Sequence, residues 1–173
     1  MRFLDLRPIA LGAAGLALAM LTAGVPAQPP ARAPAPTTDP QRLDAPNPPL
    51  PTIDLQAGMY LIRAEVASDF ATRARGLMFR ERLAPNTGMI FVFETAQRQC
   101  FWMRNTLIPL SAAFIDDDGT IVNIEDMKPL SEDPHCSARP VRFVLEMEQG
   151  WFARRGLKPG SRLLQPRLFK GGA

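Results

Sequence analysis

The chain has 173 residues, of which 20 are Lys or Arg, 17 are Asp or Glu and one is His. This length suits a single domain with additional segments, and the scattered, nearly balanced charges exclude the clustered basic surface that nucleic-acid-binding proteins use. The lone histidine excludes zinc sites built on three histidines and iron sites built on two. We therefore expect no nucleic-acid partner, no metal and no cofactor.

The amino-terminal residues 1–27 have the pattern of a secretory signal peptide. Arg2 and Arg7 precede an apolar stretch at 9–25, and the small-residue pattern VPA follows at 25–27. The stretch is short and rich in Ala and Gly, so a cleavable signal is favoured over a retained membrane anchor, which is the alternative. Cleavage would leave no transmembrane span and an exported protein, either periplasmic or secreted.

Residues 28–54 are predicted to form a disordered linker rich in Pro and Ala. Ten prolines lie between Pro26 and Pro51, interleaved with small and polar residues and with almost no large apolar ones. Proline fixes φ and removes backbone donors, so such a segment serves as an extended spacer. The folded domain is expected over 55–170.

The first elements of this domain are a strand and a short helix. Residues 60–66 alternate with a period of two, which predicts a strand with one face in the core. Ser68 is a candidate N-cap for a helix over 69–78, whose apolar residues recur at helical spacing. Gly76 weakens this helix and suggests either its end or a close backbone approach.

The stretch from Gly88 to Leu110 is the densest apolar and aromatic segment after the leader. Its segments Met89–Phe93 and Cys100–Leu107 flank a polar connector, Glu94–Gln99, so a central hairpin is predicted. A second hairpin is predicted from Ala112–Asp116 and Thr120–Ile124, because the intervening Asp-Asp-Gly supplies a turn.

The last part of the chain predicts a long loop and further short elements. We expect a loop at 127–140, a strand at 141–147, a short helix at 150–157 and a closing strand at 161–168. The resulting fold class is mainly β, a single compact β-sandwich or partly open barrel with one or two short helices.

Cys100 and Cys136 are the only cysteines. In an oxidising compartment such a pair favours a disulfide, and two buried free thiols are the alternative. We predict bonded cysteines with Cα atoms within about 7 Å, which would anchor the 127–140 loop over the end of the central hairpin.

One candidate ligand site lies on the strand predicted at 100–107. Trp102, Arg104 and Thr106 share one face of that strand, and this combination is a reasonable wall for a polar or sugar-like ligand. It is equally a common way to cover a sheet, with Arg stacked on Trp. We expect a ligand to contact Trp102, Arg104 or Asn105.

Carboxylates suggest a second possibility. Glu146 and Glu148 lie two apart on one strand face, a spacing that suits paired acid–base groups but is more typical of a solvated face. An enzyme would use Glu146 and Asp116, with Arg75 or Arg104 as an anion clamp.

Soft ligands suggest a third possibility, binding of cuprous copper. Core packing is the favoured interpretation, because most of the methionine side chains that could act as ligands fall in apolar strand or helix patterns. The candidate ligands are Met78, Met89, Met103, Met127, Met147, Cys100, Cys136 and His135.

Five motifs occur in an order that resembles a known family: RGLMFR at 75–80, GMIFVF at 88–93, FWMRNTLIPL at 101–110, FIDDDG at 114–119 and VLEMEQG at 144–150. Together they are similar to the bacterial and archaeal domain of unknown function 192, over about 110 residues. The resemblance implies one compact, mainly β domain, often behind an export signal. It implies no activity, cofactor or catalytic residue.

The sequence therefore predicts an exported, monomeric, non-catalytic binding or scaffolding domain. Its partner would be a small polar or carbohydrate-like ligand or a cell-envelope protein. The candidate ligand-binding residues are Trp102, Arg104, Asn105, Arg75 and Glu146.

Overall fold

The computed structural model describes residues 44–169. The predicted signal peptide at 1–27 and most of the predicted linker lie outside the described residues. The end of the predicted linker does lie inside them, and it belongs to the folded unit. Asn47 is buried, and the first strand begins at Thr52. The domain therefore begins before Leu55, because this segment has hydrogen-bonding partners elsewhere in the fold.

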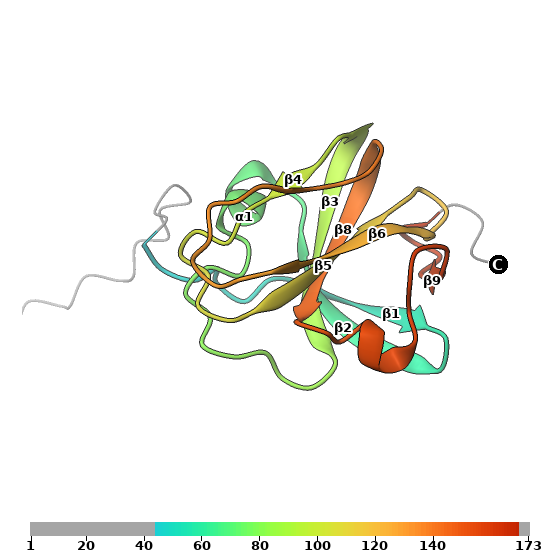
Figure 1. The fold of residues 1–173 in the computed structure, drawn as a ribbon, viewed down its shortest axis with the longest axis horizontal. Coiled ribbons are helices and arrows are strands. Elements are labelled where there is room, and N and C mark those ends of the chain that lie inside the picture. Colours follow the sequence, from blue (N-terminus) through green and yellow to red (C-terminus); the bar gives the residue numbers. More distant parts are fainter. Residues whose placement is uncertain (1–43, 170–173) are drawn as a thin grey trace, which may run out of the picture. The chain divides into compact units, whose positions relative to one another are not determined.

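Nine strands, one α-helix and one 3-10 helix make up the described chain (Figure 1). They are β1 (Thr52–Ala57), β2 (Tyr60–Ala67), α1 (Phe70–Arg75), β3 (Thr87–Gln97), β4 (Cys100–Phe101), β5 (Leu110–Ile115), β6 (Ile121–Met127), β7 (His135–Cys136), β8 (Val141–Glu148), the 3-10 helix η1 (Ala153–Arg155) and β9 (Leu163–Leu164). Seven strands form one sheet in the order β6-β5-β8-β3-β2-β1-β9, and β4 pairs with β7 in a second, small sheet.

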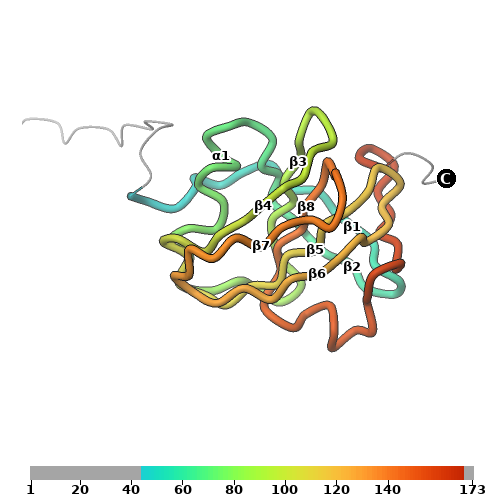
Figure 2. The backbone as a smooth tube through the Cα atoms, turned by 45° about the horizontal axis from the view of Figure 1, so that its top comes forward, coloured from blue at the N-terminus to red at the C-terminus, as the bar shows by residue number. Residues whose placement is uncertain are grey.

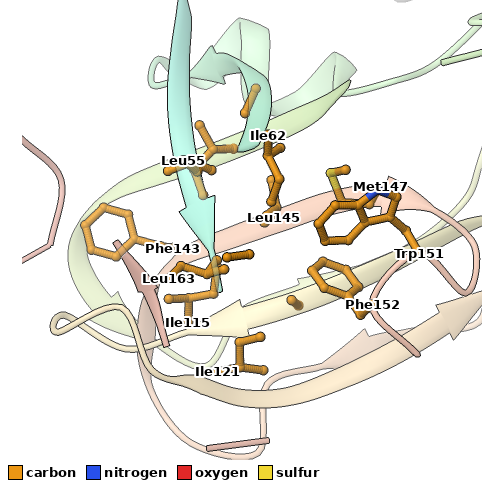
Figure 3. Close-up of a cluster of buried hydrophobic side chains, with 14 of the residues drawn as sticks. Leu55, Ile62, Ile115, Ile121, Phe143, Leu145, Met147, Trp151, Phe152 and Leu163 are labelled. Atoms are coloured by element: carbon orange, nitrogen blue, oxygen red, sulfur yellow. The ribbon is translucent and has the colours of Figure 1, made fainter. Parts of the chain in front are cut away.

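The large sheet curls into a partly open barrel, which confirms the expected mainly β fold class with short helices (Figure 1). Side chains from both ends of the sheet meet on its inner face, including Leu55 of β1, Ile121 of β6 and Leu163 of β9 (Figure 3). Phe143 and Leu145 of the central strand β8 join them. Apolar side chains fill this inner face, and their burial stabilises the fold.

Strand register decides which residues reach the outer face. Ile90 pairs with Leu145, which pairs with Ala113, and all three belong to the inner cluster. Successive side chains of a strand point to opposite faces, so the next row points outward. That row contains Met89, Glu146 and Ala112. Met89 and Ala112 accordingly belong to a second apolar cluster on the outer face.

The predicted central hairpin is wrong. β3 pairs with β2 in parallel and with β8 antiparallel, and β4 does not pair with it. Only Cys100 and Phe101 of the predicted second strand are extended and paired. The chain then turns at Asn105, whose φ is 58°. Dense apolar residues here signalled burial against the outer face of the sheet, and that burial did not require strand pairing.

The predicted disulfide is confirmed. β4 and β7 lie side by side (Figure 2), and Cys100 is directly opposite Cys136 in this pair. The Cα atoms of the two cysteines are 4.0 Å apart. The second predicted hairpin and the strand at 141–147 are also present, as β5–β6 and β8. The closing strand is much shorter than expected, at two residues.

Helix α1 is shorter than predicted, and its N-cap is Asp69, not Ser68. The Thr72 amide donates to the Asp69 carboxylate, and the Thr72 hydroxyl accepts from the Asp69 amide, which completes a capping box. The helix ends at Gly76, whose φ of 50° is readily adopted by glycine. This early end leaves Leu77 and Met78 free to pack on the outer face of the sheet as a non-helical segment.

Candidate functional site

A pocket of about 310 Å³ lies on the outer face of the sheet, between α1, β3 and the segment that follows β4. Its size is at the lower end of the range for small-molecule sites. It is lined by Phe70, Arg73, Ala74, Arg75, Gly76, Leu77, Met78, Phe91, Phe93, Gln99, Cys100, Phe101, Trp102, Thr106 and Glu146.

Glu146 is the only residue that β8 contributes to this pocket. Its side chain lies in the outer row between Met89 and Ala112, and the residue is only 4% exposed. Among residues 44–169, no hydrogen bond or ion pair involves its carboxyl group. The expectation that Glu146 lies on a solvated strand face is therefore wrong, because the cover over the outer face buries it.

Burial also changes the ionisation of Glu146. Desolvation raises the pKa of its carboxyl group to about 8, because the charged form loses its water without gaining a partner. At neutral pH the group is therefore mostly protonated. A protonated carboxyl group has one O–H donor as well as an acceptor oxygen. The pocket thus contains a neutral hydrogen-bonding group in a lining that combines aromatic walls with two arginines.

Aromatic rings form the pocket walls. Phe101 lies edge-on to Phe91, with ring centroids 4.8 Å apart, and edge-on to Phe93 at 6.5 Å. Such pairs hold their rings in fixed orientations. Two further aromatic side chains of the lining are exposed to solvent, Phe70 at 82% and Trp102 at 49%. The lining therefore extends from a buried interior to a solvent-exposed mouth.

Two arginines of α1 carry the positive charge of the lining. Buried Arg75 donates from Nη1 to Asn47 Oδ1 at 3.2 Å, and Asn47 Nδ2 donates to the carbonyl oxygens of Thr72 and Gly76. The Thr72 carbonyl also accepts from the Gly76 amide, so Asn47 adds a second hydrogen bond there and one to the Gly76 carbonyl directly after the helix. Asn47 thus joins the segment before β1 to the helix that lines the pocket.

Arg73 lies over the ring of Phe93, with its guanidinium carbon 5.0 Å from the ring centroid. Its Nη1 donates to the carbonyl oxygens of Val92, at 2.9 Å, and Ser68. Within the described range it pairs with no carboxylate. Arg73 is therefore a fixed cation of the pocket whose charge is not neutralised by a carboxylate.

The structure brings together three of the five predicted ligand-binding residues, since Arg75, Trp102 and Glu146 all line the pocket. Arg104 does not line it. Its guanidinium carbon lies 5.8 Å from the ring centroid of Trp102, and its Nε is 3.8 Å from a carboxylate oxygen of Glu132. Arg104 thus stacks against one of the mouth residues from outside the lining.

Asn105 has a positioning role. Its carbonyl oxygen accepts a hydrogen bond from the Phe79 amide at 2.8 Å, and its side-chain nitrogen lies 3.9 Å from the sulfur of Met78. Phe79 itself has a φ of 61°, an uncommon conformation for a bulky residue. Asn105 therefore ties the segment after α1 to the segment after β4, and both line the pocket.

Asp116 lies apart from the pocket, at the end of β5. Its carboxylate pairs with Arg139 at 2.7 Å, and both side chains are exposed. The carboxylate pair of the enzyme hypothesis is therefore not assembled. Glu148, the other candidate partner, is also exposed, and it pairs with Arg154 at 2.9 Å.

The copper hypothesis loses its thiol ligands, because Cys100 and Cys136 are bonded to each other. Met89, Met103, Met127 and Met147 are at most 1% exposed and belong to the two apolar clusters. In the part of the chain that the structure describes, no group of three or more His, Cys, Asp or Glu side chains could hold a metal ion. Likewise, none of the helices at 44–169 could span a membrane.

Sequence reasoning missed the phenylalanine walls and Arg73. One available signal was the composition of β8, where Val144 lies on the same face as Glu146. An apolar neighbour two residues away indicates that the outer face of this strand is covered.

Solved structures of similar proteins have the same fold. A protein of unknown function from Novosphingobium aromaticivorans DSM 12444 is 37% identical, with a TM-score of 0.65, and the match covers 70% of this chain and 91% of that one. A protein from Sinorhizobium meliloti 1021, described as a "putative transcription regulator", is 39% identical with a TM-score of 0.60, and the match covers 64% of this chain and 88% of that one.

A search of the curated proteins found no match. The model of one protein family, however, matches residues 53–165, and the family is described as "Uncharacterized ACR". This range contains every strand from β2 to β9 and every pocket-lining residue. The match confirms the resemblance seen in the five motifs, and the chain belongs to the domain of unknown function 192 family, DUF192.

Proposed function

We propose that this protein is a small-ligand-binding domain and that the pocket beneath α1 is its binding site. The observation that carries the proposal is Glu146, a buried carboxyl group that faces the pocket without a hydrogen-bond partner among the described residues. Burying a polar group without a partner costs free energy, so folding alone does not account for it. A ligand that hydrogen-bonds to Glu146 would offset this cost.

The exposed aromatic side chains at the pocket mouth support the same proposal. Phe70 and Trp102 remain in contact with water although large apolar side chains gain stability when buried. A ligand in the pocket would cover part of both. Aromatic residues that combine with a few polar groups in a concave site are typical of small-molecule binding.

The disulfide supports export, because such bonds persist in oxidising compartments. We therefore propose a periplasmic or secreted, monomeric binding protein. The pocket makes a small ligand our preferred partner over a cell-envelope protein. Regulation of transcription, the role printed for the Sinorhizobium protein, is not favoured for this chain, because several of this chain's exposed arginines pair with carboxylates, as in Arg63–Asp54 and Arg154–Glu148.

A thermal-shift screen of sugars, peptidoglycan fragments and small organic acids tests the proposal. Compounds that bind the pocket should raise the melting temperature of the wild type but not of Trp102→Ala. Met59→Ala, which removes an exposed side chain at a position outside the pocket lining, is the matched control and should respond like the wild type. Equal shifts in all three proteins, or no shift with any compound, would contradict a ligand site in this pocket.

An acid–base enzyme is a second candidate, favoured by one observation. Glu146 has a pKa near neutrality and lies in a concave site, as a general acid often does. A compound that binds the wild type but is also converted by it, and not by Glu146→Gln, would establish this function. Unchanged compound after prolonged incubation, with binding intact, would leave the non-catalytic proposal standing.

A further inference from the structure

Building on the proposed function, we infer that the ligand of this pocket is a small organic anion with an apolar body, whose acidic group lies near Arg73 and whose far end presents an oxygen acceptor to Glu146. The charges, the hydrogen-bonding groups and the walls of the pocket each contribute one part of this description.

The charges of the lining favour an anion. Its only charged or titratable side chains are Arg73, Arg75 and Glu146, and the structure gives Arg73 no carboxylate partner at 44–169. Glu146 is mostly neutral at neutral pH, so the net charge of the lining is positive. In a partly buried site with a low local dielectric, this charge attracts anions and disfavours amines.

The buried end favours an oxygen acceptor. A protonated Glu146 has an O–H group that no described residue accepts, and a carbonyl or hydroxyl oxygen of the ligand would accept it. Glu146 pairs across the sheet with Met89, whereas Arg73 of α1 lies over Phe93, four residues further along β3. At about 3.3 Å per residue of strand, the Arg73 charge and the carboxyl group of Glu146 therefore lie at different ends of the pocket.

The walls between these two ends favour an apolar body. Phe101 lies edge-on to both Phe91 and Phe93 along the lining. A flat or aliphatic ligand body would bury its surface against these rings. A fully hydroxylated sugar would instead place polar groups against them without hydrogen-bond partners, which costs binding free energy.

Four probes with one common ring separate these features: 4-acetylbenzoate has the anion and the acceptor, 4-ethylbenzoate lacks the acceptor, 4-acetylbenzamide lacks the charge, and 4-acetylbenzylamine reverses it. Titration calorimetry of the full chain at pH 6.5 should give the tightest binding for 4-acetylbenzoate. Losing either feature should weaken binding about tenfold, as expected for one hydrogen bond to a charged or buried group.

Variants assign each feature to its residue. Glu146→Gln retains a donor and should retain the preference for the acetyl group, whereas Glu146→Met should abolish it. Arg73→Lys retains the charge and should retain the preference for the carboxylate, whereas Arg73→Gln should abolish it. In the wild type, the acetyl preference should decline as pH rises above about 8, and in Glu146→Gln it should not.

Two results would overturn the inference and leave the binding proposal intact. One is tighter binding of the amine than of the carboxylate, together with its loss in Glu146→Gln, which would assign a cationic ligand. The other is failure of all four probes while another class of compound gives Trp102-dependent shifts in the thermal screen. Failure of the probes and of the whole screen would remove both proposals.

Discussion

On the inner face of the sheet, Ile90, Leu145 and Ala113 form a row of apolar side chains, whereas the next row on the outer face contains Met89, Glu146 and Ala112. The same three strands supply both rows. The inner row is covered by apolar side chains from other strands of the same sheet and by Trp151 and Phe152. The outer row is covered by α1 and by irregular segments, which leave a pocket.

This difference shows how one sheet separates stability from binding. Regular strands that curl over their own inner face can exclude polar groups that lack partners, and the buried Ser111 of this face bonds to Asp126 and to the Gly150 amide. A short helix that ends at Gly76 and a chain that turns at Asn105 cannot seal the outer face as completely. The buried carboxyl group of Glu146 is accordingly found on the face that has such an opening.

The largest effect is expected from moving the carboxyl group to the inner face. Leu145→Glu would place it in the inner row, between the apolar residues Ile90 and Ala113. We expect a loss of about 5 kcal/mol or more of the unfolding free energy, enough to unfold many domains. Circular dichroism and urea unfolding measure this. The matched control, Leu145→Met, should cost less than about 1.5 kcal/mol. A well-folded Leu145→Glu protein would show that the two faces do not differ as described.

The second prediction concerns the pH dependence that Glu146 imposes on the outer face. Its pKa is about 8 in the folded chain against an ordinary value of 4.5, so the folded state retains a proton that the unfolded state has lost between these values. Stability should therefore fall as pH rises from about 4.5 to 8 and level off above. The loss has an upper limit of about 5 kcal/mol, since one pKa unit is worth about 1.4 kcal/mol.

Glu146→Gln should lack this loss and should therefore exceed the wild type in unfolding free energy at pH 8.5 but not at pH 4. Urea unfolding at both values measures the difference. Glu148→Gln, which alters an exposed carboxylate, is the control and should keep the wild-type pH dependence. The same pH dependence in wild type and Glu146→Gln would refute a buried, unpartnered carboxyl group.

The third prediction concerns the disulfide, which fixes one wall of the outer face. Its cysteines are 36 residues apart, and a crosslink over such a loop contributes roughly 3 to 4 kcal/mol in the chain-entropy model. Replacing both cysteines with alanine should lower the unfolding free energy by about this amount. The loss should be accompanied by faster hydrogen exchange at β4 and β7 and unchanged exchange at β1, whose buried residues Leu55 and Ala57 belong to the inner cluster. Uniformly faster exchange would indicate that the two faces are not independent.

The smallest predicted effect concerns Asn47. Its side chain donates to the carbonyls of Thr72 and Gly76 and accepts from Arg75, so Asn47→Ala should cost about 2 kcal/mol through the loss of these largely buried hydrogen bonds. Gln56→Ala removes an exposed amide that bonds to Gly58 and should change stability by less than about 0.5 kcal/mol. Thermal unfolding compares the two variants. Equal effects would mean that Asn47 does not hold the helix over the outer face.

The sequence predicted those parts of the fold that local chemistry decides. The alternation in Val141–Met147, the Asp-Asp-Gly turn before Thr120 and the pair Cys100–Cys136 all correspond to observed structure. The alternation at 60–66 also corresponds to the observed strand β2, in which Ile62 and Ala64 are buried between more exposed neighbours. In each case, nearby residues or covalent chemistry fix the outcome.

Features that depend on distant partners were not predictable in this way. Phe101 and Met103 are apolar because they pack on the outer face, and a local pattern cannot distinguish this from strand pairing. The same limit applies to the site. Glu146 was singled out, but its burial depends on α1, more than 70 residues earlier in the chain. Arg73 and the phenylalanine walls likewise become a site only through the sheet register.

The disulfide has a practical consequence for anyone who searches for the ligand. Cys100 lines the pocket, and its bond to Cys136 holds that wall against β7. Without the bond, this contact would rely on a few hydrogen bonds, such as those between Gln99 and Ser137. Routine buffers that contain dithiothreitol or a phosphine would thus assay a protein with one wall of its pocket released. Expression in an oxidising host and purification without reductant are therefore part of any meaningful binding measurement.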